Sequence, residues 1–343
     1  HMDQAGKDNS WASEQLSAWG IKPNNDHWAT LSQRAQEGDV LVTQAITELI
    51  DDNASADIVR ASLLQELAAF PSNASVKTAL KHLQDESPMV RRAAVSTMQA
   101  LPPQVRWKLL SPHLKDESRS VRFQLAETLS DLLAQLPGDQ RHILSPVIEE
   151  YRDSLAVSAD SPATQIAIAM LELRLGDITA AENAYLQALR IEPNYVPALL
   201  NMADFYRGTA RDIEAETLLK RALSVAPDSG AAQHSFGLLL IRKGDYKGAL
   251  PHLKLATEQA DAQARFAYIY AVALDNLGQT KDAAKTLIKA TERWPNQYDL
   301  LMTLVLYLEK SGNTYSIKKY VSQLMKIAPT EPVVKQLAEQ YVH

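Results

Sequence analysis

A repeat of 34 residues constrains the fold of this chain more than any other feature of its sequence. Glycines recur with this step, and Ala210 occupies the one place where the glycine is missing: Gly176, Gly244, Gly278 and Gly312. Prolines recur with the same step, and Asp261 fills their gap: Pro193, Pro227, Pro295 and Pro329. A fixed period of this length indicates a stack of small helical units rather than one compact core.

Small residues recur between these two lattices, where two antiparallel helices must approach closely. The second helix of each unit carries them at one position, with Ile317 in the fifth unit: Ala181, Ala215, Ala249 and Ala283. The first helix carries them at Ala203, Gly237 and Ala271. A glycine that closes the first helix and a proline that ends the second complete a pattern that resembles the tetratricopeptide repeat family. The resemblance implies five units over residues 162–331 and a capping helix over residues 332–343.

The first half of the chain has a different period. Val59-Arg60, Val90-Arg91 and Val121-Arg122 follow one another with a step of 31 residues, and His82–Ser87 recurs in part as His113–Ser118. This pattern resembles HEAT-type repeats, of which about three fit within residues 40–153. We expect the aspartate before each second helix to cap amide groups and the arginine to bond back to the turn.

These two arrays predict an all-α fold, an α-α superhelix of HEAT-like units followed by tetratricopeptide units. We expect residues 1–10, which begin His1-Met2 as a cloning remnant does, to be a tag and a disordered N-terminus. We predict N-terminal capping helices in residues 11–39, which include Trp11, Trp19 and Trp28. The short polar run Asp153–Pro162 is interpreted as the join, so the arrays should abut as one rod.

Composition argues against several classes of function. The net charge of −6 divides into −7 for residues 1–160 and +1 for residues 161–343, which disfavours nucleic-acid binding because that requires a basic face. The chain has no cysteine, its eight histidines lack metal-ligand spacing, and no catalytic motif is present. No apolar run is long enough for membrane insertion. We therefore predict a protein that is not an enzyme and has no metal and no cofactor of its own.

The first helices of tetratricopeptide arrays line a concave groove, which is the predicted binding site for a protein or peptide partner. This stripe is apolar along its middle, and it lacks the cluster of Lys, Arg and Asn that binds a C-terminal carboxylate. An apolar or amphipathic segment is therefore favoured as its ligand. The alternative is that these residues pack against neighbouring first helices or the final helix. The predicted groove residues are Ile166, Met170, Leu200, Asn201, Asp204, Arg207, His234, Leu238, Ile241, Arg242, Tyr268, Val272, Asn276, Met302 and Leu306.

A wider resemblance depends on the order of the arrays and on the stretch His27-Trp28…Glu37-Gly38-Asp39. Together they resemble the C-terminal half of a bacterial multihaem cytochrome c family. The resemblance implies an accessory docking module beside a haem-bearing domain of the same parent polypeptide, in the periplasm or another extracytoplasmic place. This chain has no C-x-x-C-H motif for haem attachment. Without that resemblance, the expectation is a free-standing cytoplasmic scaffold.

Overall fold

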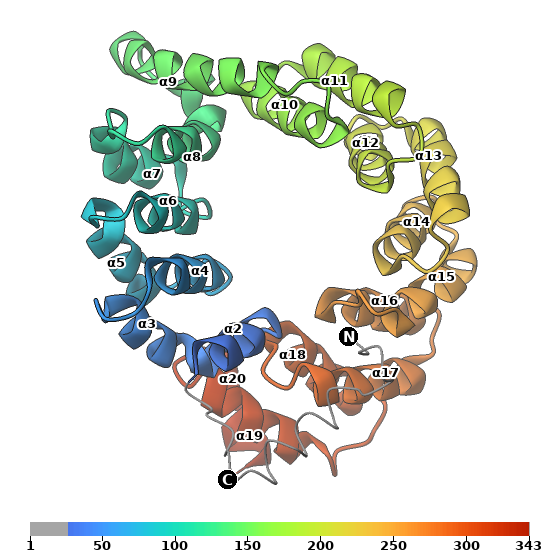
Figure 1. Cartoon of the computed structure of the whole chain (residues 1–343). Helices are drawn as coiled ribbons and strands as arrows, with labels where there is room; N and C mark the ends of the chain where they lie inside the picture. The colour runs from blue at the N-terminus through green and yellow to red at the C-terminus, as the bar shows by residue number, and fades with distance from the viewer. Residues whose placement is uncertain (1–26, 343) are drawn as a thin grey trace, which may run out of the picture.

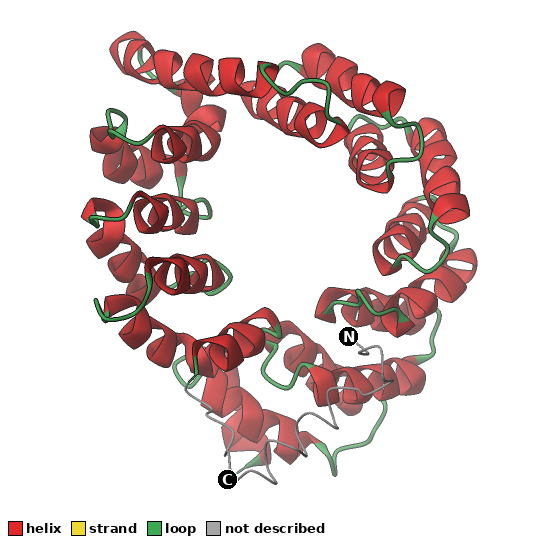
Figure 2. Cartoon of the chain, in the orientation of Figure 1, coloured by secondary structure: helices red, strands yellow, loops and turns green. Residues whose placement is uncertain are grey.

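The described part of the chain is built from helices alone. Residues 27–342 of this computed structural model form α-helices and short 3₁₀ helices, and this range contains no strand (Figure 2). The predicted all-α superhelix is therefore confirmed. The expected tag at residues 1–10 and the first part, residues 11–26, of the capping helices expected over residues 11–39 lie outside the described residues.

The first array contains three stacked helix pairs, α3–α4, α5–α6 and α7–α8, with α2 before them and the long α9 after them. Its α-helices are α2 (Trp28–Gln36), α3 (Thr43–Asp51), α4 (Asp57–Leu67), α5 (Asn73–Lys81), α6 (Pro88–Thr97), α7 (Pro103–Leu110), α8 (Arg119–Leu129) and α9 (Gly138–Ala156). Its 3₁₀ helices are η1 (Val40–Val42), η2 (His82–Gln84), η3 (Ser111–His113) and η4 (Ser130–Gln135).

Arginines of the second helices connect successive units of this array. As predicted, Arg91 bonds back to the turn before its own helix, where its Nη1 donates to the carbonyl of Asp85 at 2.8 Å. Asp85 in turn accepts from the backbone N–H of Ser87 at 3.0 Å. A second contact was not predicted: Arg91 Nε also donates to Asp116 of the next unit at 2.8 Å, just as Arg60 Nη1 donates to Asp85 at 2.7 Å. Each arginine therefore bridges two units.

The second array contains five helix pairs and one final helix. The pairs are α10 (Pro162–Leu175) with α11 (Ile178–Ile191), α12 (Val196–Gly208) with α13 (Asp212–Val225), α14 (Gly230–Arg242) with α15 (Tyr246–Glu258), α16 (Ala264–Asn276) with α17 (Thr280–Arg293), and α18 (Tyr298–Lys310) with α19 (Ile317–Ile327). The final helix, α20 (Pro332–Tyr341), packs on α19. Successive pairs stack because the second helix of one contacts the first helix of the next.

The lattice glycines end the first helices in the left-handed conformation, which L-residues with a Cβ seldom adopt. Their φ angles lie between 75° and 85° at Gly176, Gly244, Gly278 and Gly312. Ala210 adopts the same conformation with a φ of 60°. There the N–H of Arg211 donates to the carbonyl of Tyr206 at 2.8 Å, which satisfies a carbonyl at the end of α12. Ala210 therefore ends its helix in the same left-handed conformation as the glycines, but with backbone strain that glycine would not have.

The small residues lie where the two helices of a unit cross, as predicted. A Cβ added to Gly237 of α14 would stand 2.5 Å from Cδ2 of Leu253 on α15, closer than real contacts allow. Ala249, at the small position of α15, has no exposed surface. Helix crossings in this array are therefore fixed by close approach rather than by long interdigitating side chains.

The two arrays are joined by a continuous apolar core. The join between α9 and α10 is confined to residues 157–161 and is shorter than the predicted Asp153–Pro162. Leu171 of α10 is buried in the same apolar cluster as Leu129 of α8 and Leu144 of α9. This shared core fixes the direction in which the second array leaves the first.

The helices follow a ring rather than a rod. Figure 1 shows the two arrays curving towards each other until α2 meets the segment between α17 and α18. Asn296 in that segment donates a hydrogen bond to Asp39, which is 257 residues away in the sequence. The predicted rod is therefore wrong, because small rotations between successive units accumulate along both arrays into a closed curve.

Candidate functional site

The predicted groove residues lie on α10, α12, α14, α16 and α18. Figure 1 shows that the first four of these helices form the inner row of the ring together with α4, α6 and α8, while α11, α13, α15 and α17 lie outside them. Most of the predicted apolar groove residues are half-buried, but Met170 is 43% exposed and Leu306 is 55% exposed. The inner row of the second array therefore carries apolar surface that its neighbours leave partly uncovered.

His234 is the groove residue that the sequence placed wrongly. It is only 5% exposed, and its ring stacks on that of Phe266 of α16 with 4.3 Å between the ring centroids. Burial, together with the charges of Arg265 and Arg207, lowers the pKa of His234 to about 4. A neutral, stacked imidazole at this depth holds α14 against α16 and offers nothing to a ligand.

A cavity of about 490 Å³ lies between the first two units, and it brings together predicted residues that are far apart in the sequence. Met170 of α10 lies in its wall with Asn201 and Asp204 of α12. Tyr185 and Phe205 belong to the apolar part of the wall, and sequence reasoning assigned neither of them to the groove. Their spacing along the helices could have indicated this role only if the crossing of α10 and α12 were already known.

Burial, with the nearby charge of Asp204, raises the pKa of Tyr185, so its phenol stays neutral beside the thioether of Met170. The amide of Asn201 donates to the carbonyl of Pro197 in its own helix at 2.8 Å. This cavity wall therefore combines a thioether, two aromatic rings and the aliphatic side chains of Leu173 and Ile178, which suits an apolar side chain.

Three cations at the edges of the stripe already have carboxylate partners. Arg207 pairs with Asp204 at 2.8 Å. Arg242 pairs with Asp212 of α13 at 3.1 Å. Lys310 of α18 pairs with Asp275 of α16 at 2.8 Å. None of these three residues therefore presents an unpaired charge to an acidic ligand.

The final helix touches only one end of the stripe. The hydroxyl of Tyr341, at the end of α20, donates to Glu309 of α18 at 2.6 Å. The main packing of α20 is against α19, on the side away from α10, α12 and α14. The last helix of the chain therefore does not fill the whole stripe, which was one alternative raised by the sequence.

A cluster of ionisable side chains in the HEAT-like array is structural. His82 is buried with Nδ1 3.0 Å from Asp85 and Nε2 2.9 Å from Asp51 of the preceding unit. Burial opposes ionisation of Asp85, but hydrogen bonds from Arg60 and from its neighbours outweigh burial and lower its pKa to about 2. Within residues 27–342, no group of three or more His, Asp or Glu is placed to hold a metal ion. No helix in the same range is long and apolar enough to cross a membrane.

Comparison with known families agrees with this architecture. The HEAT repeats family model matches residues 43–130. Two tetratricopeptide repeat models match residues 172–236 and 234–298. Together with the helix pairs described above, these matches identify a solenoid with HEAT repeats within residues 43–130 and tetratricopeptide repeats within residues 172–298. Repeats of these two kinds are in general scaffolds for protein–protein interaction, and the solenoid therefore has a protein as its expected class of partner.

Solved structures similar to the solenoid include PilW, described as a widely conserved type IV pilus biogenesis factor, with 19% identity over 65% of this chain and 99% of that chain and a TM-score of 0.47. YrrB, described as a tetratricopeptide protein with an unusual peptide-binding site, shares 18% identity over 55% of this chain and 97% of that chain, with a TM-score of 0.41. MamA from Desulfovibrio magneticus RS-1 shares 21% identity over 50% of this chain and 97% of that chain, with a TM-score of 0.42. These similarities are too low to transfer a partner to the solenoid. No curated protein sequence matches it.

The resemblance to multihaem cytochromes stays a prediction, because none of these matches concerns it. Part of the stretch that suggested it has a structural role: Trp28 begins α2, and Gly38 and Asp39 contact the far end of the solenoid. The expected extracytoplasmic place and the absence of a cofactor also remain predictions.

Proposed function

We propose that this chain is a non-enzymatic interaction scaffold whose inner tetratricopeptide helices bind an apolar or amphipathic segment of a partner protein. The observation that carries the proposal is a contrast along one surface. Apolar side chains of the stripe, such as Met170, are left exposed, whereas three cations at its edges, Arg207, Arg242 and Lys310, are neutralised by the chain's own carboxylates. A surface of this kind favours apolar side chains over an acidic terminus.

Within the stripe we assign the central contacts to Leu238 and Tyr268, which occupy adjacent units, and the peripheral contact to Met170. Both central residues are half-buried, so part of each side chain is available to a ligand. Aromatic and aliphatic anchors near the middle of an interface commonly dominate its binding free energy, whereas charged residues at the rim contribute less.

The test is a selection of short peptides from a random library on the intact protein, followed by affinity measurement with single clones. The double substitution Leu238→Ala with Tyr268→Ala should weaken binding about 30-fold or more, which corresponds to about 2 kcal/mol. Ile213→Ala provides the matched control, because Ile213 is 80% exposed on an outer helix. It should leave the affinity unchanged.

Two results would refute the proposal. One is a selection dominated by acidic C-terminal peptides. The other is loss of binding on substitution of charged residues in the HEAT-like array while Leu238→Ala with Tyr268→Ala retains full affinity. Circular dichroism of each variant checks that its helical content is intact.

A further inference from the structure

The ring is closed by polar contacts between residues at its two ends. Asn296 Nδ2, in the segment between α17 and α18, donates to Asp39 Oδ1 at 2.6 Å. Gln297 Nε2 donates to the carbonyl of Glu37 at 3.3 Å. Asp39 and Asn296 are each 8% exposed. We call this group of contacts, made by residues 37–39 and residues 296–297, the seam.

Both sides of the seam are held in place by their own array before they meet. Asp39 accepts from the guanidinium of Arg34 at 2.7 Å and from the N–H of Leu41 at 3.0 Å, which fixes its carboxylate at the start of η1. On the other side, the amide oxygen of Asn296 accepts from Gln323 of α19. The two partners therefore require little further ordering when they come together.

Gly38 allows the close approach of the two ends. Its φ of 80° lies in the left-handed region, and a Cβ at this position would stand 1.4 Å from Nε2 of Gln297. A side chain here would therefore push aside the flexible amide of Gln297 that donates to Glu37, and its backbone would be strained by the left-handed φ. The local sequence Glu37-Gly38-Asp39 thus brings three features together: a carbonyl that accepts from Gln297, a glycine without a side chain, and a carboxylate held in place by its own array.

The seam differs in kind from the other junction of the two arrays. Across the α9–α10 junction one buried apolar cluster continues from α8 to Leu171. At the seam, the core of the first array and the core at the end of the second array stay separate clusters. Two cavities, of about 470 Å³ and about 340 Å³, flank the polar contacts.

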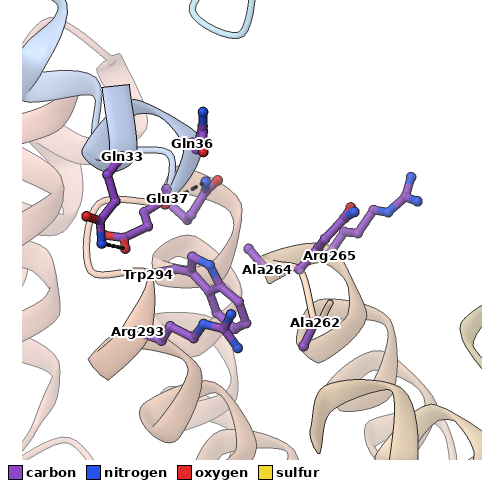
Figure 3. Close-up of a pocket in the computed structure, with 10 residues that line it drawn as sticks. Gln33, Gln36, Glu37, Ala262, Ala264, Arg265, Arg293 and Trp294 are labelled. Carbon is purple, nitrogen blue, oxygen red and sulfur yellow. Dashed lines mark hydrogen bonds between the residues drawn. The ribbon is translucent and has the colours of Figure 1, made fainter. Parts of the chain in front are cut away.

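Figure 3 shows the larger cavity, with Gln33 and Glu37 of the first array on the same side of the view as Arg293 and Trp294 of the second, and with Ala262, Ala264 and Arg265 on the other side. Arg293 lies over the indole of Trp294, 4.7 Å from the ring centroid, so its cation contacts its own array. Glu37 likewise accepts from Gln33 in its own array at 3.0 Å. The walls of this cavity therefore add no ion pair between the two arrays.

We propose that the molecule opens and closes at the seam, which acts as a latch, and that the α9–α10 junction stays closed. Hydrogen bonds that water can replace contribute little net stability, whereas separating a buried apolar core is costly. Opening at the seam divides no shared apolar cluster and leaves both arrays folded. An open ring would receive the middle of a long partner from the side, whereas a closed ring admits only a free end.

The latch can be tested by distance measurements between spin labels, because the chain has no cysteine of its own. Cysteines at Gln36 and Gln263 place exposed labels on opposite walls of the larger cavity. A second pair at His142 and Ala163, both exposed, reports on the α9–α10 junction. Neither pair depends on the proposed function or on any ligand.

In the parent protein the seam pair should give a predominant short distance. Asn296→Ala should deplete this short-distance population and add longer distances, while the α9–α10 pair stays unchanged. Gly38→Ala should do the same by a different route, because its Cβ meets Gln297. Asn201→Ala is the matched control, since its amide bonds only to its own helix and its removal should leave both pairs unchanged.

The latch is refuted if both seam variants keep the parent distance distribution with intact helical content. It is equally refuted if the distances change at the α9–α10 pair instead of at the seam pair. If one seam variant fails to fold, the other still decides between these outcomes.

Discussion

Replacement of Ala210 by glycine should stabilise the protein, which is an unusual direction for a substitution to glycine. Ala210 has a φ of 60°, the left-handed conformation that costs an L-residue about 1–2 kcal/mol. Glycine removes this strain but gains about 0.4–1 kcal/mol of conformational freedom in the unfolded chain. Ala210 is exposed, so loss of its methyl group forfeits little buried surface. The net gain in the free energy of unfolding should be about 0.5–1 kcal/mol.

Gly278→Ala is the reciprocal substitution. Gly278 has a φ of 75°, and no atom lies within 4 Å of a Cβ built there, so the added methyl group meets no steric obstacle. Its effect is therefore conformational alone, and it should destabilise the protein by about 0.5–1 kcal/mol.

Reversible urea unfolding followed by circular dichroism measures both effects. A solenoid can unfold in more than one step, so the same comparison is made by hydrogen exchange of the Arg211 amide, which closes the turn after α12. Ala210→Gly should slow exchange of this amide. Faster exchange, or a lower free energy of unfolding, would show that the left-handed conformation at Ala210 is not strained and that the 34-residue lattice was misinterpreted.

Two other substitutions test packing and titration. Gly237→Ala should lower the free energy of unfolding by about 1–3 kcal/mol because its Cβ overlaps Leu253. Gly208→Ala is the control and should not destabilise the protein, because no atom lies within 4 Å of a Cβ built there. Urea unfolding distinguishes the two variants. The pKa of His234 is lowered from 6.5 to about 4, so between these values the unfolded chain binds a proton that the folded chain does not. The stability from neutral His234 should be complete above pH 6.5 and lost as the pH falls to about 4, and His234→Phe should remove this component from stability measured across that range.

The sequence predicted those features that are determined within one unit. The glycines that close the first helices followed from the 34-residue repeat alone, since each turn closes within its own helix pair. The close crossing at Gly237 followed from the recurrence of small residues. In the HEAT-like array, the bond of Arg91 to its own turn could be predicted in the same way.

Features that depend on the curvature of the whole solenoid could not be predicted. The contact between Asp39 and Asn296 requires the summed rotation of every unit between them, and neither residue stands on a repeat lattice. His234 occupies a first-helix position typical of a groove, but Phe266 of the next unit covers it. The reach of Arg91 to Asp116 depends likewise on how two units stack.

The central claim is that partners bind the inner face of the ring, and site-specific photo-crosslinking in cells that naturally contain the protein tests it most directly. A photoreactive phenylalanine derivative would be placed at Met170 or Leu306, which are 43% and 55% exposed on the stripe. For comparison it would be placed at Ile213 or Tyr315, which lie off the stripe and are 80% and 96% exposed. We expect one defined protein adduct from the stripe positions and none from the other two. The same adduct from Ile213 or Tyr315, without one from the stripe, would contradict the claim.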